Sequence, residues 1–234
     1  AGLPAGDIEI AYKTIGKGYP LVMIMGYSGT MDIWGPQVVN ELAKYYKVIV
    51  FDNRGMGKST DSGQEFSIDL FADDIARLLN ALKIKKTHIL AWSMGTNIAL
   101  DFVLEYPDKV NKLVLYAADC GGSNNIWPDQ EVMKKLGNNL DKPRERAVEM
   151  LKILFPVDWL KAHPDPRKYF PIPKETSSAQ NIQRQFGAME KWSGAYSRLP
   201  EIACPVLLIT GTEDILTPPK NSFIIAEKIP GAWL

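Results

Sequence analysis

The 234-residue chain contains only two cysteines and two histidines, and its formal net charge is zero. The cysteines, Cys120 and Cys204, lie far apart in sequence, which is typical of a reducing, cytoplasmic setting. Lysine plus arginine and aspartate plus glutamate number 27 each, so neither nucleic acid nor an anionic membrane surface is favoured as a partner. No apolar run is long enough to span a bilayer, and no cluster of ligand residues predicts a metal site. The composition indicates an ordinary globular protein.

The most informative stretch is Thr87-His-Ile-Leu-Ala-Trp-Ser93-Met-Gly95. Residues 87–92 predict a short buried strand, and the apolar residues from Met94 onward recur at helical spacing. Ser93 therefore falls at a sharp strand-to-helix turn, within an Ala-x-Ser-x-Gly variant of the Gly-x-Ser-x-Gly nucleophile elbow. Such a turn needs small neighbours and holds its serine in a strained conformation. Because the Met94 N–H begins a helix, it favours an anion, so a nucleophile and half of an oxyanion hole are expected from adjacent residues. The alternative is that Ser93 merely caps an ordinary helix.

Short apolar runs alternate with helical patterns along the first 122 residues. This alternation predicts parallel strands joined by right-handed crossovers, and hence an α/β fold with a mainly parallel sheet covered on both faces. Buried strands are expected at residues 21–25, 47–52, 87–92 and 110–116, with an edge strand at 8–12 and a helix capped by Ser67. The sheet is expected to resume at residues 205–210, followed by a helix over 219–228.

The alternation stops between residues 123 and 198. This segment contains many aromatic residues among prolines and helical patterns, and it shows no convincing strand. We therefore predict a core made of residues 1–122 and 199–234, with residues 123–198 inserted as a helical cap.

Four motifs occur in one order along the predicted core. They are Met25-Gly-Tyr-Ser-Gly29, Asp52-Asn-Arg-Gly-Met-Gly-Lys-Ser59, Ala91-Trp-Ser-Met-Gly95 and Gly211-Thr-Glu-Asp-Ile-Leu-Thr-Pro218. With these motifs the chain resembles the α/β-hydrolase family, in particular its serine esterase-like members with a helical cap. The resemblance implies that Ser93 is the nucleophile and that Asp214 orients the catalytic base. It also implies an oxyanion hole formed by the Tyr27 and Met94 N–H groups, and chemistry that needs no cofactor and no metal.

The resemblance leaves open a second candidate for the catalytic acid and does not identify the residues of the substrate pocket. Asp119 follows the preceding strand, where some members of the fold place their acid. Aromatic residues near the serine and in the cap favour an apolar acyl or leaving group on a small-molecule substrate, although packing within the cap is the alternative. The residues that we expect to line this pocket are Trp92, Trp127, Trp159 and Trp192.

The scarcity of histidine bears directly on the catalytic base, because an unactivated serine hydroxyl is a poor nucleophile. His88 lies five residues before Ser93 in the same strand, which separates the two by about 16 Å. His163 lies in the cap and precedes Asp214, against the family order of serine, acid and histidine. In the family the histidine follows one further strand, and residues 230–234 resemble the approach to that strand. We therefore expect the base to lie outside these 234 residues, and the 234-residue form to be nearly inactive.

A serine at the elbow favours acyl transfer through an acyl-enzyme, with water as the acceptor. The leading prediction is a serine esterase, or a related enzyme that hydrolyses acyl compounds. The alternatives on the same fold are a C–C bond hydrolase, an enol-lactonase, an aminopeptidase or a perhydrolase. A further alternative is a hydrolase-fold binding protein without catalytic activity.

Overall fold

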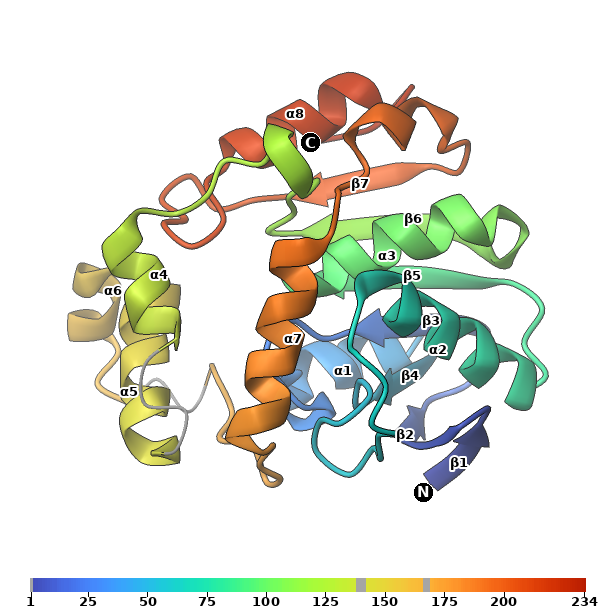
Figure 1. Cartoon of the computed structure of the whole chain (residues 1–234), viewed down its shortest axis with the longest axis horizontal. Coiled ribbons are helices and arrows are strands. Elements are labelled where there is room, and N and C mark those ends of the chain that lie inside the picture. The colour runs from blue at the N-terminus through green and yellow to red at the C-terminus, as the bar shows by residue number, and fades with distance from the viewer. Residues whose placement is uncertain (1, 138–141, 166–168) are drawn as a thin grey trace.

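The computed structural model describes residues 2–137, 142–165 and 169–234, and a seven-stranded sheet runs through the molecule (Figure 1). The strands are β1 (Gly2–Ala5), β2 (Ile8–Ile15), β3 (Tyr19–Ile24), β4 (Tyr46–Phe51), β5 (Thr87–Trp92), β6 (Val110–Tyr116) and β7 (Val206–Ile209). The α-helices are α1 (Pro36–Ala43), α2 (Ile68–Ala81), α3 (Met94–Glu105), α4 (Gln130–Gly137), α5 (Pro143–Leu154), α6 (Val157–Ala162), α7 (Ala179–Lys191) and α8 (Lys220–Lys228). Short 3₁₀ turns include Met31–Ile33, Pro107–Lys109, Gly122–Asn124 and Tyr196–Glu201.

The strand order is β1-β2-β4-β3-β5-β6-β7. The pairs β1–β2 and β2–β4 are antiparallel, and every later pair is parallel. The parallel part places the carboxyl ends of β3, β5, β6 and β7 along one edge of the sheet. The α/β class and the mainly parallel sheet predicted from the sequence are thus confirmed.

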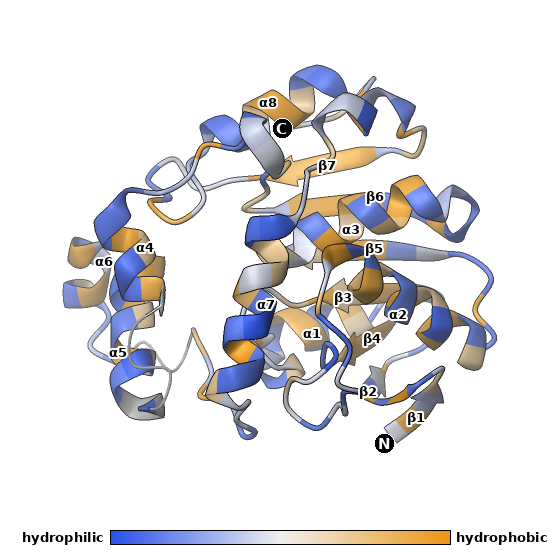
Figure 2. Ribbon diagram, viewed as in Figure 1, coloured by the Kyte–Doolittle hydropathy of each residue, from blue (hydrophilic) through white to orange (hydrophobic). Residues whose placement is uncertain are grey.

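Helices cover both faces of the central strands, as alternate residues of β3 show. Val22 and Ile24 pack into the larger core cluster, to which α2, α3 and α8 contribute. Leu21 and Met23 point to the opposite face and pack with Val39 of α1. This two-sided burial explains why the strand reads as a continuous apolar run in the sequence. In Figure 2 the middle strands are mostly hydrophobic, whereas α2 and α7 are banded with hydrophilic residues.

Several element boundaries follow the sequence prediction closely. β5 and β6 begin and end at the predicted residues, and the Ser67 hydroxyl accepts a hydrogen bond from the Leu70 N–H at 3.2 Å as the cap of α2. The prediction that residues 8–12 form an edge strand is wrong, because β2 is the second strand of the sheet and β1 lies outside it. β1 has only four residues, and Pro4 interrupts its pattern, so it gives no recognisable alternation of its own.

The β7 side of the sheet carries one further pairing. Trp233 forms a parallel bridge with Leu207, in which the Trp233 N–H donates to the Val206 carbonyl at 2.9 Å. The Leu208 N–H in turn donates to the Trp233 carbonyl at 2.7 Å. Residues near 233 therefore approach the outer edge of β7, where the sequence analysis expects a further strand.

Helices α4 to α7 all fall within the segment predicted to form a cap. Figure 1 shows α4, α5 and α6 grouped to one side of the sheet, with α7 between them and the remaining helices. The division into a core and a cap at residues 123 and 198 stays a prediction. Across the described part of the chain, no helix combines the length and apolar character that crossing a membrane requires.

The motif from Asp52 to Ser59 serves to hold loops together. The buried Arg54 guanidinium pairs with Asp74 at 2.7 Å and with Asp7 at 2.9 Å. Asp52 accepts hydrogen bonds from the Met31 and Lys58 N–H groups. These contacts give the motif a structural role as a turn that joins neighbouring loops.

One carboxyl on α3 makes stability depend on pH. Burial is the main cause that raises the pKa of Asp101 to about 6, and the negative charges of Asp69 and Glu105 add to it. A hydrogen bond from the Trp192 side chain and the charge of Arg198 act in the opposite direction. Because this value lies above the unfolded value of 3.8, the folded state binds the proton more tightly. The unfavourable contribution is therefore absent at low pH and complete above about pH 6.

Asp101→Asn is accordingly expected to stabilise the protein at pH 8 by about 1 kcal/mol, with a gain that shrinks as the pH falls toward 4. The amide oxygen retains an acceptor for the Trp192 side chain while the negative charge is lost. Urea denaturation of both proteins at pH 8 and pH 4.5 measures the difference. An equal gain at both pH values would contradict the electrostatic explanation.

Candidate active site

Ser93 occupies the strained turn between β5 and α3. Its backbone angles are φ 54° and ψ −127°, a region that residues with a side chain rarely adopt. The Ser93 N–H donates to the Tyr116 carbonyl at 2.9 Å, and the Ser93 carbonyl accepts from the Thr96 N–H at 2.7 Å. Neighbouring strand and helix therefore hold the serine in place, as the elbow pattern predicted.

Two glycines make this turn sterically feasible. A Cβ at Gly95 would lie 2.4 Å from the Ile24 carbonyl oxygen, so α3 approaches β3 closely only because this side chain is absent. A Cβ at Gly26 would lie 3.1 Å from the Ser93 Cβ and 3.0 Å from the Trp92 carbonyl oxygen. The small residues of the elbow and of the loop after β3 thus allow both to meet at Ser93.

Gly95→Ala is expected to destabilise the fold by about 2 kcal/mol, because the methyl group overlaps backbone that cannot easily move. Gly187→Ala in the middle of α7 is the matched control, since a Cβ there meets nothing within 4 Å. The control is expected to stabilise by about 0.5 kcal/mol through helix propensity. Thermal and urea unfolding of both variants measure the effect, and equal stabilities would contradict the close approach at Gly95.

The loop that follows β3 carries the second predicted oxyanion donor. The Gly29 N–H donates to the Gly26 carbonyl at 3.2 Å and closes a turn with Tyr27 and Ser28 at its centre. Neither the Tyr27 N–H nor the Met94 N–H donates a hydrogen bond to any described residue. Both residues line one cavity with Ser93. That the two N–H groups reach a single acceptor remains a prediction.

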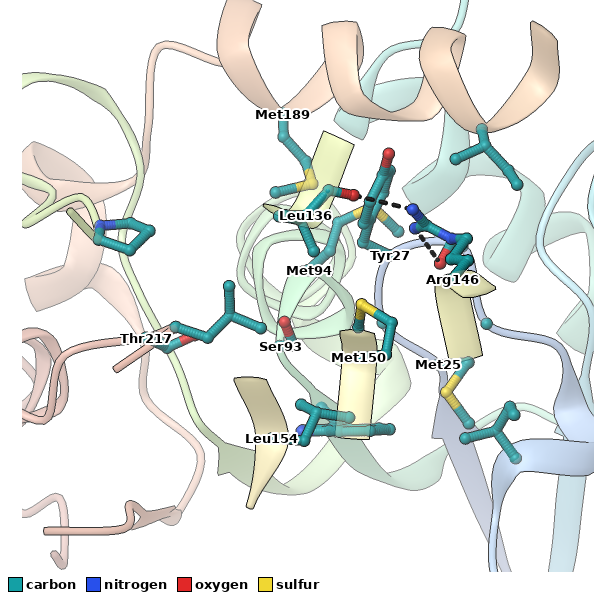
Figure 3. Close-up of a pocket in the computed structure, with 18 of the residues that line it drawn as sticks. Met25, Tyr27, Ser93, Met94, Leu136, Arg146, Met150, Leu154, Met189 and Thr217 are labelled. Carbon is teal, nitrogen blue, oxygen red and sulfur yellow. Dashed lines mark hydrogen bonds between the residues drawn. The ribbon is translucent and has the colours of Figure 1, made fainter. Parts of the chain in front are cut away.

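We call this space the serine cavity; it has a volume of about 190 Å³ and a largely apolar wall. Figure 3 shows the Ser93 hydroxyl among side chains from the loop after β3 and from helices α3, α4, α5 and α7. Five of the eight methionines line it: Met25, Met94, Met133, Met150 and Met189. Methionine is flexible and polarisable, so such a wall adapts to apolar groups of different shape.

Two carboxylates lie near the serine, in different surroundings. Asp214 lies in the loop after β7, and its Oδ1 accepts hydrogen bonds from the Leu216 and Thr217 N–H groups at 2.9 and 2.7 Å. Burial raises its pKa. Asp214 and Ser93 line a second space, the acid cavity, which adjoins the serine cavity at Trp92, Ser93 and Thr217. The predicted nucleophile and acid are thereby brought to the same cavity.

Asp119, the second acid candidate, lines the serine cavity itself. Its Oδ1 accepts hydrogen bonds from the Asn97 side-chain amide at 3.0 Å and from the Gly121 N–H at 2.9 Å. Burial raises its pKa as well. The structure therefore keeps both carboxylates as candidates, because each lines a cavity that Ser93 also lines.

Neither histidine lines the serine cavity or the acid cavity. His88 lies near the start of β5, at the opposite end of the strand from Ser93, and its ring packs against Tyr19 with centroids 4.6 Å apart. The His163 ring stacks on Trp159 at 4.0 Å, and its Nδ1 lies 2.8 Å from the Trp159 carbonyl oxygen. Both histidines have packing roles in the described structure.

The four tryptophans proposed for the pocket divide into two pairs. Trp92 and Trp127 line the serine cavity. Trp159 and Trp192 do not, because their rings pack elsewhere: Trp159 stacks on Phe155 with centroids 4.5 Å apart, and Trp192 is buried after α7 beside Gly121. Sequence alone identified aromatic residues but not the direction in which each ring points.

Two polar residues contact the loop of residues 26–29 although no sequence pattern indicated them, Arg146 on α5 and Gln185 on α7. Arg146 also lines the serine cavity, and Figure 3 shows it beside Tyr27. Neither residue belongs to a recognisable motif, and both lie more than 100 residues from the loop in sequence. Among the described residues, no group of three or more histidine, cysteine or acidic side chains is placed to hold a metal ion.

A family profile described as alpha/beta hydrolase fold matches residues 19–234. The chain belongs to this family. The family match and the mainly parallel seven-stranded sheet confirm the resemblance to α/β-hydrolases that the four motifs indicated.

Curated relatives of this alpha/beta hydrolase include the human protein named serine hydrolase BPHL, which is 28% identical over 240 residues. That alignment covers 100% of this chain and 77% of the relative. A putative carbamate hydrolase RutD from Caulobacter sp. (strain K31) is 26% identical, with 99% of this chain and 88% of the relative covered.

Solved structures show the same fold. A thermophilic esterase from Thermogutta terrifontis superposes with a TM-score of 0.82 at 24% identity, covering 99% of this chain and 87% of the other. The enol-lactonase from Burkholderia xenovorans LB400 gives a TM-score of 0.81 at 21% identity, covering 100% and 89%. At these identities the likeness concerns the fold alone.

Proposed function

We propose that the protein is a serine hydrolase that cleaves a carboxylic ester, or a similar acyl compound, through an acyl-enzyme on Ser93. The observation that carries this proposal is the strained Ser93 turn at a cavity that Tyr27 and Met94 also line. A relative named as a serine hydrolase supports the choice of serine as nucleophile.

In this mechanism the Ser93 Oγ attacks the acyl carbon while a base takes its proton. The carbonyl oxygen becomes an oxyanion that accepts hydrogen bonds from the Tyr27 and Met94 N–H groups. The C–O bond to the leaving alcohol then breaks, and the base returns the proton to that alcohol. Water, deprotonated by the same base, then attacks the acyl-enzyme; the bond to Ser93 breaks, the carboxylic acid leaves, and the base returns the proton to the Ser93 oxygen.

The base in this proposal is a histidine outside the 234 residues, because His88 and His163 both lie away from the two cavities. Asp214 would orient it. Both backbone N–H bonds to Asp214 end on Oδ1, which leaves Oδ2 as the oxygen to accept from the imidazole N–H.

The serine cavity favours a substrate with an apolar group next to the reacting carbonyl. Its volume of about 190 Å³ somewhat exceeds that of a ~150 Å³ apolar cavity known to hold benzene. We therefore expect groups of phenyl size. Relatives named as carbamate hydrolases make carbamates the second substrate class to consider, because carbamate cleavage passes through a similar tetrahedral oxyanion.

The test is hydrolysis of p-nitrophenyl esters by the intact protein, together with labelling by a fluorophosphonate that reacts with activated serines. We expect turnover of acetate to hexanoate esters and of phenylacetate, and a single label on the peptide that contains Ser93. Turnover without a label on Ser93, or no turnover of any ester or carbamate, would contradict the proposal. The second result would favour a hydrolase-fold binding protein.

A further inference from the structure

The loop that carries Tyr27 holds a strained residue, Ser28. Its φ of 58° lies in the left-handed region, whereas Tyr27 has no positive φ. A positive φ at the third position is what a type II turn requires, and glycine or asparagine usually occupies it. A serine there costs of order 1 kcal/mol unless its surroundings hold it. The turn that positions the Tyr27 N–H therefore depends on contacts from outside the loop.

Two residues from the predicted cap supply such contacts to Ser28. The Gln185 Oε1 of α7 accepts a hydrogen bond from the Ser28 N–H at 2.7 Å. The Arg146 Nη2 of α5 donates to the Ser28 Oγ at 3.0 Å. The backbone and the side chain of one strained residue are thus each held by a different helix.

Both contacting side chains are deeply buried. Gln185 is 0% exposed and Arg146 is 9% exposed. Arg146 is fixed further, because its Nη1 donates to the Leu136 carbonyl of α4 at 2.8 Å and its guanidinium lies 5.5 Å from the centre of the Tyr27 ring. No described group accepts from the Gln185 Nε2, so the bond from Ser28 to Oε1 is the polar contact that fixes this side chain. Burying the Gln185 amide with its Nε2 unpaired costs desolvation free energy, and the hydrogen bond from the Ser28 N–H is the contact that offsets this cost.

We propose that Gln185, with Arg146, is a positioning residue that holds the loop of residues 26–29 in its strained turn and so keeps the Tyr27 N–H directed at the reacting carbonyl oxygen. The inference rests on the proposed serine hydrolase function. The contacts of α5 and α7 with Ser28 are then required for the oxyanion hole and not only for the shape of the cavity. When these contacts are lost, the turn relaxes and the Tyr27 donor leaves its place.

The main test is Gln185→Leu, which keeps the size of the side chain and removes the acceptor. In the intact protein we expect kcat to fall about 10- to 100-fold while KM stays within about twofold, because an oxyanion donor acts mainly in the transition state. The matched control is Asn181→Leu, one turn earlier on α7. The Asn181 Nδ2 donates to the Gly55 carbonyl at 3.0 Å, so it too joins α7 to a core loop, but not to the loop of residues 26–29. The control should keep its kcat.

A rescue variant separates positioning from general stability. Glycine adopts a positive φ without strain, so Ser28→Gly favours the turn even when Gln185 no longer holds it and the Arg146 contact to the Ser28 hydroxyl is lost as well. In the Gln185→Leu background, Ser28→Gly is therefore expected to restore kcat at least threefold. A purely structural role for Gln185 would not respond in this way.

Amide hydrogen exchange gives a readout that does not need turnover. In Gln185→Leu the peptide covering residues 25–30 should exchange faster, while peptides from β5 and α2 keep the wild-type rate. Faster exchange with an unchanged kcat would show that positioning of the loop by Gln185 does not affect catalysis and would overturn the proposal. Unchanged exchange would show that Gln185 does not hold the loop and would overturn it too. If the wild-type protein hydrolyses nothing, the proposed function fails, yet exchange still decides whether Gln185 holds the loop.

Discussion

Replacing Ser93 with alanine is expected to reduce ester hydrolysis by the intact protein by about 10⁶-fold, the loss seen when a serine hydrolase loses its nucleophile. The residual rate would come from the oxyanion donors and from substrate binding. Binding itself should survive, because alanine leaves the apolar wall of the serine cavity unchanged. Single-turnover hydrolysis and binding of a non-hydrolysable ketone such as 2-octanone measure the two effects separately.

Ser93→Gly provides a matched control for this loss. Both variants lack the hydroxyl, so both should be inactive. They differ in backbone freedom, because φ 54° with ψ −127° suits glycine and strains alanine. We expect the free energy of unfolding of Ser93→Gly to exceed that of Ser93→Ala by about 1 kcal/mol. Appreciable activity in either variant would mean that another group is the nucleophile, and equal stabilities would mean that the turn stores no strain.

Much of the fold could be predicted because its signals are local. β5 and β6 lie in a parallel sheet buried on both faces, so their sequences read as short apolar runs between turn residues. The elbow could be predicted because a small residue before and after Ser93 is a steric requirement, as Gly95 shows by its approach to Ile24. β1 escaped because four residues with a proline carry no periodicity.

The contacts that the sequence did not reveal join distant segments. Ser28 and Gln185 are 157 residues apart, and Ser28 and Arg146 are 118 apart. No periodic pattern relates such positions, because their proximity depends on how the tertiary structure places α5 and α7 next to the loop of residues 26–29. For the same reason the sequence did not reveal that Trp159 and Trp192 lie outside the serine cavity. Trp159 stacks on another aromatic ring, and Trp192 packs into the core.

The choice between the two acids can be made with one chemical change applied at two positions. Asp214→Asn is expected to lower kcat about 10⁴-fold, because an asparagine amide favours the wrong tautomer of the imidazole base. The asparagine oxygen still accepts from the Leu216 and Thr217 N–H groups, so the loop should keep its shape.

Asp119→Asn is the matched partner, since this carboxylate is also buried with a raised pKa and also accepts two hydrogen bonds on Oδ1. If Asp214 orients the base, Asp119→Asn should change kcat by less than about tenfold, an effect of packing around Asn97. Because removing a buried charge relieves its desolvation, neither variant should lose much stability, and unfolding experiments verify this. A 10⁴-fold loss at Asp119 with a mild effect at Asp214 would instead place the acid after β6, and the proposed triad would have to be reassigned around the wall of the serine cavity.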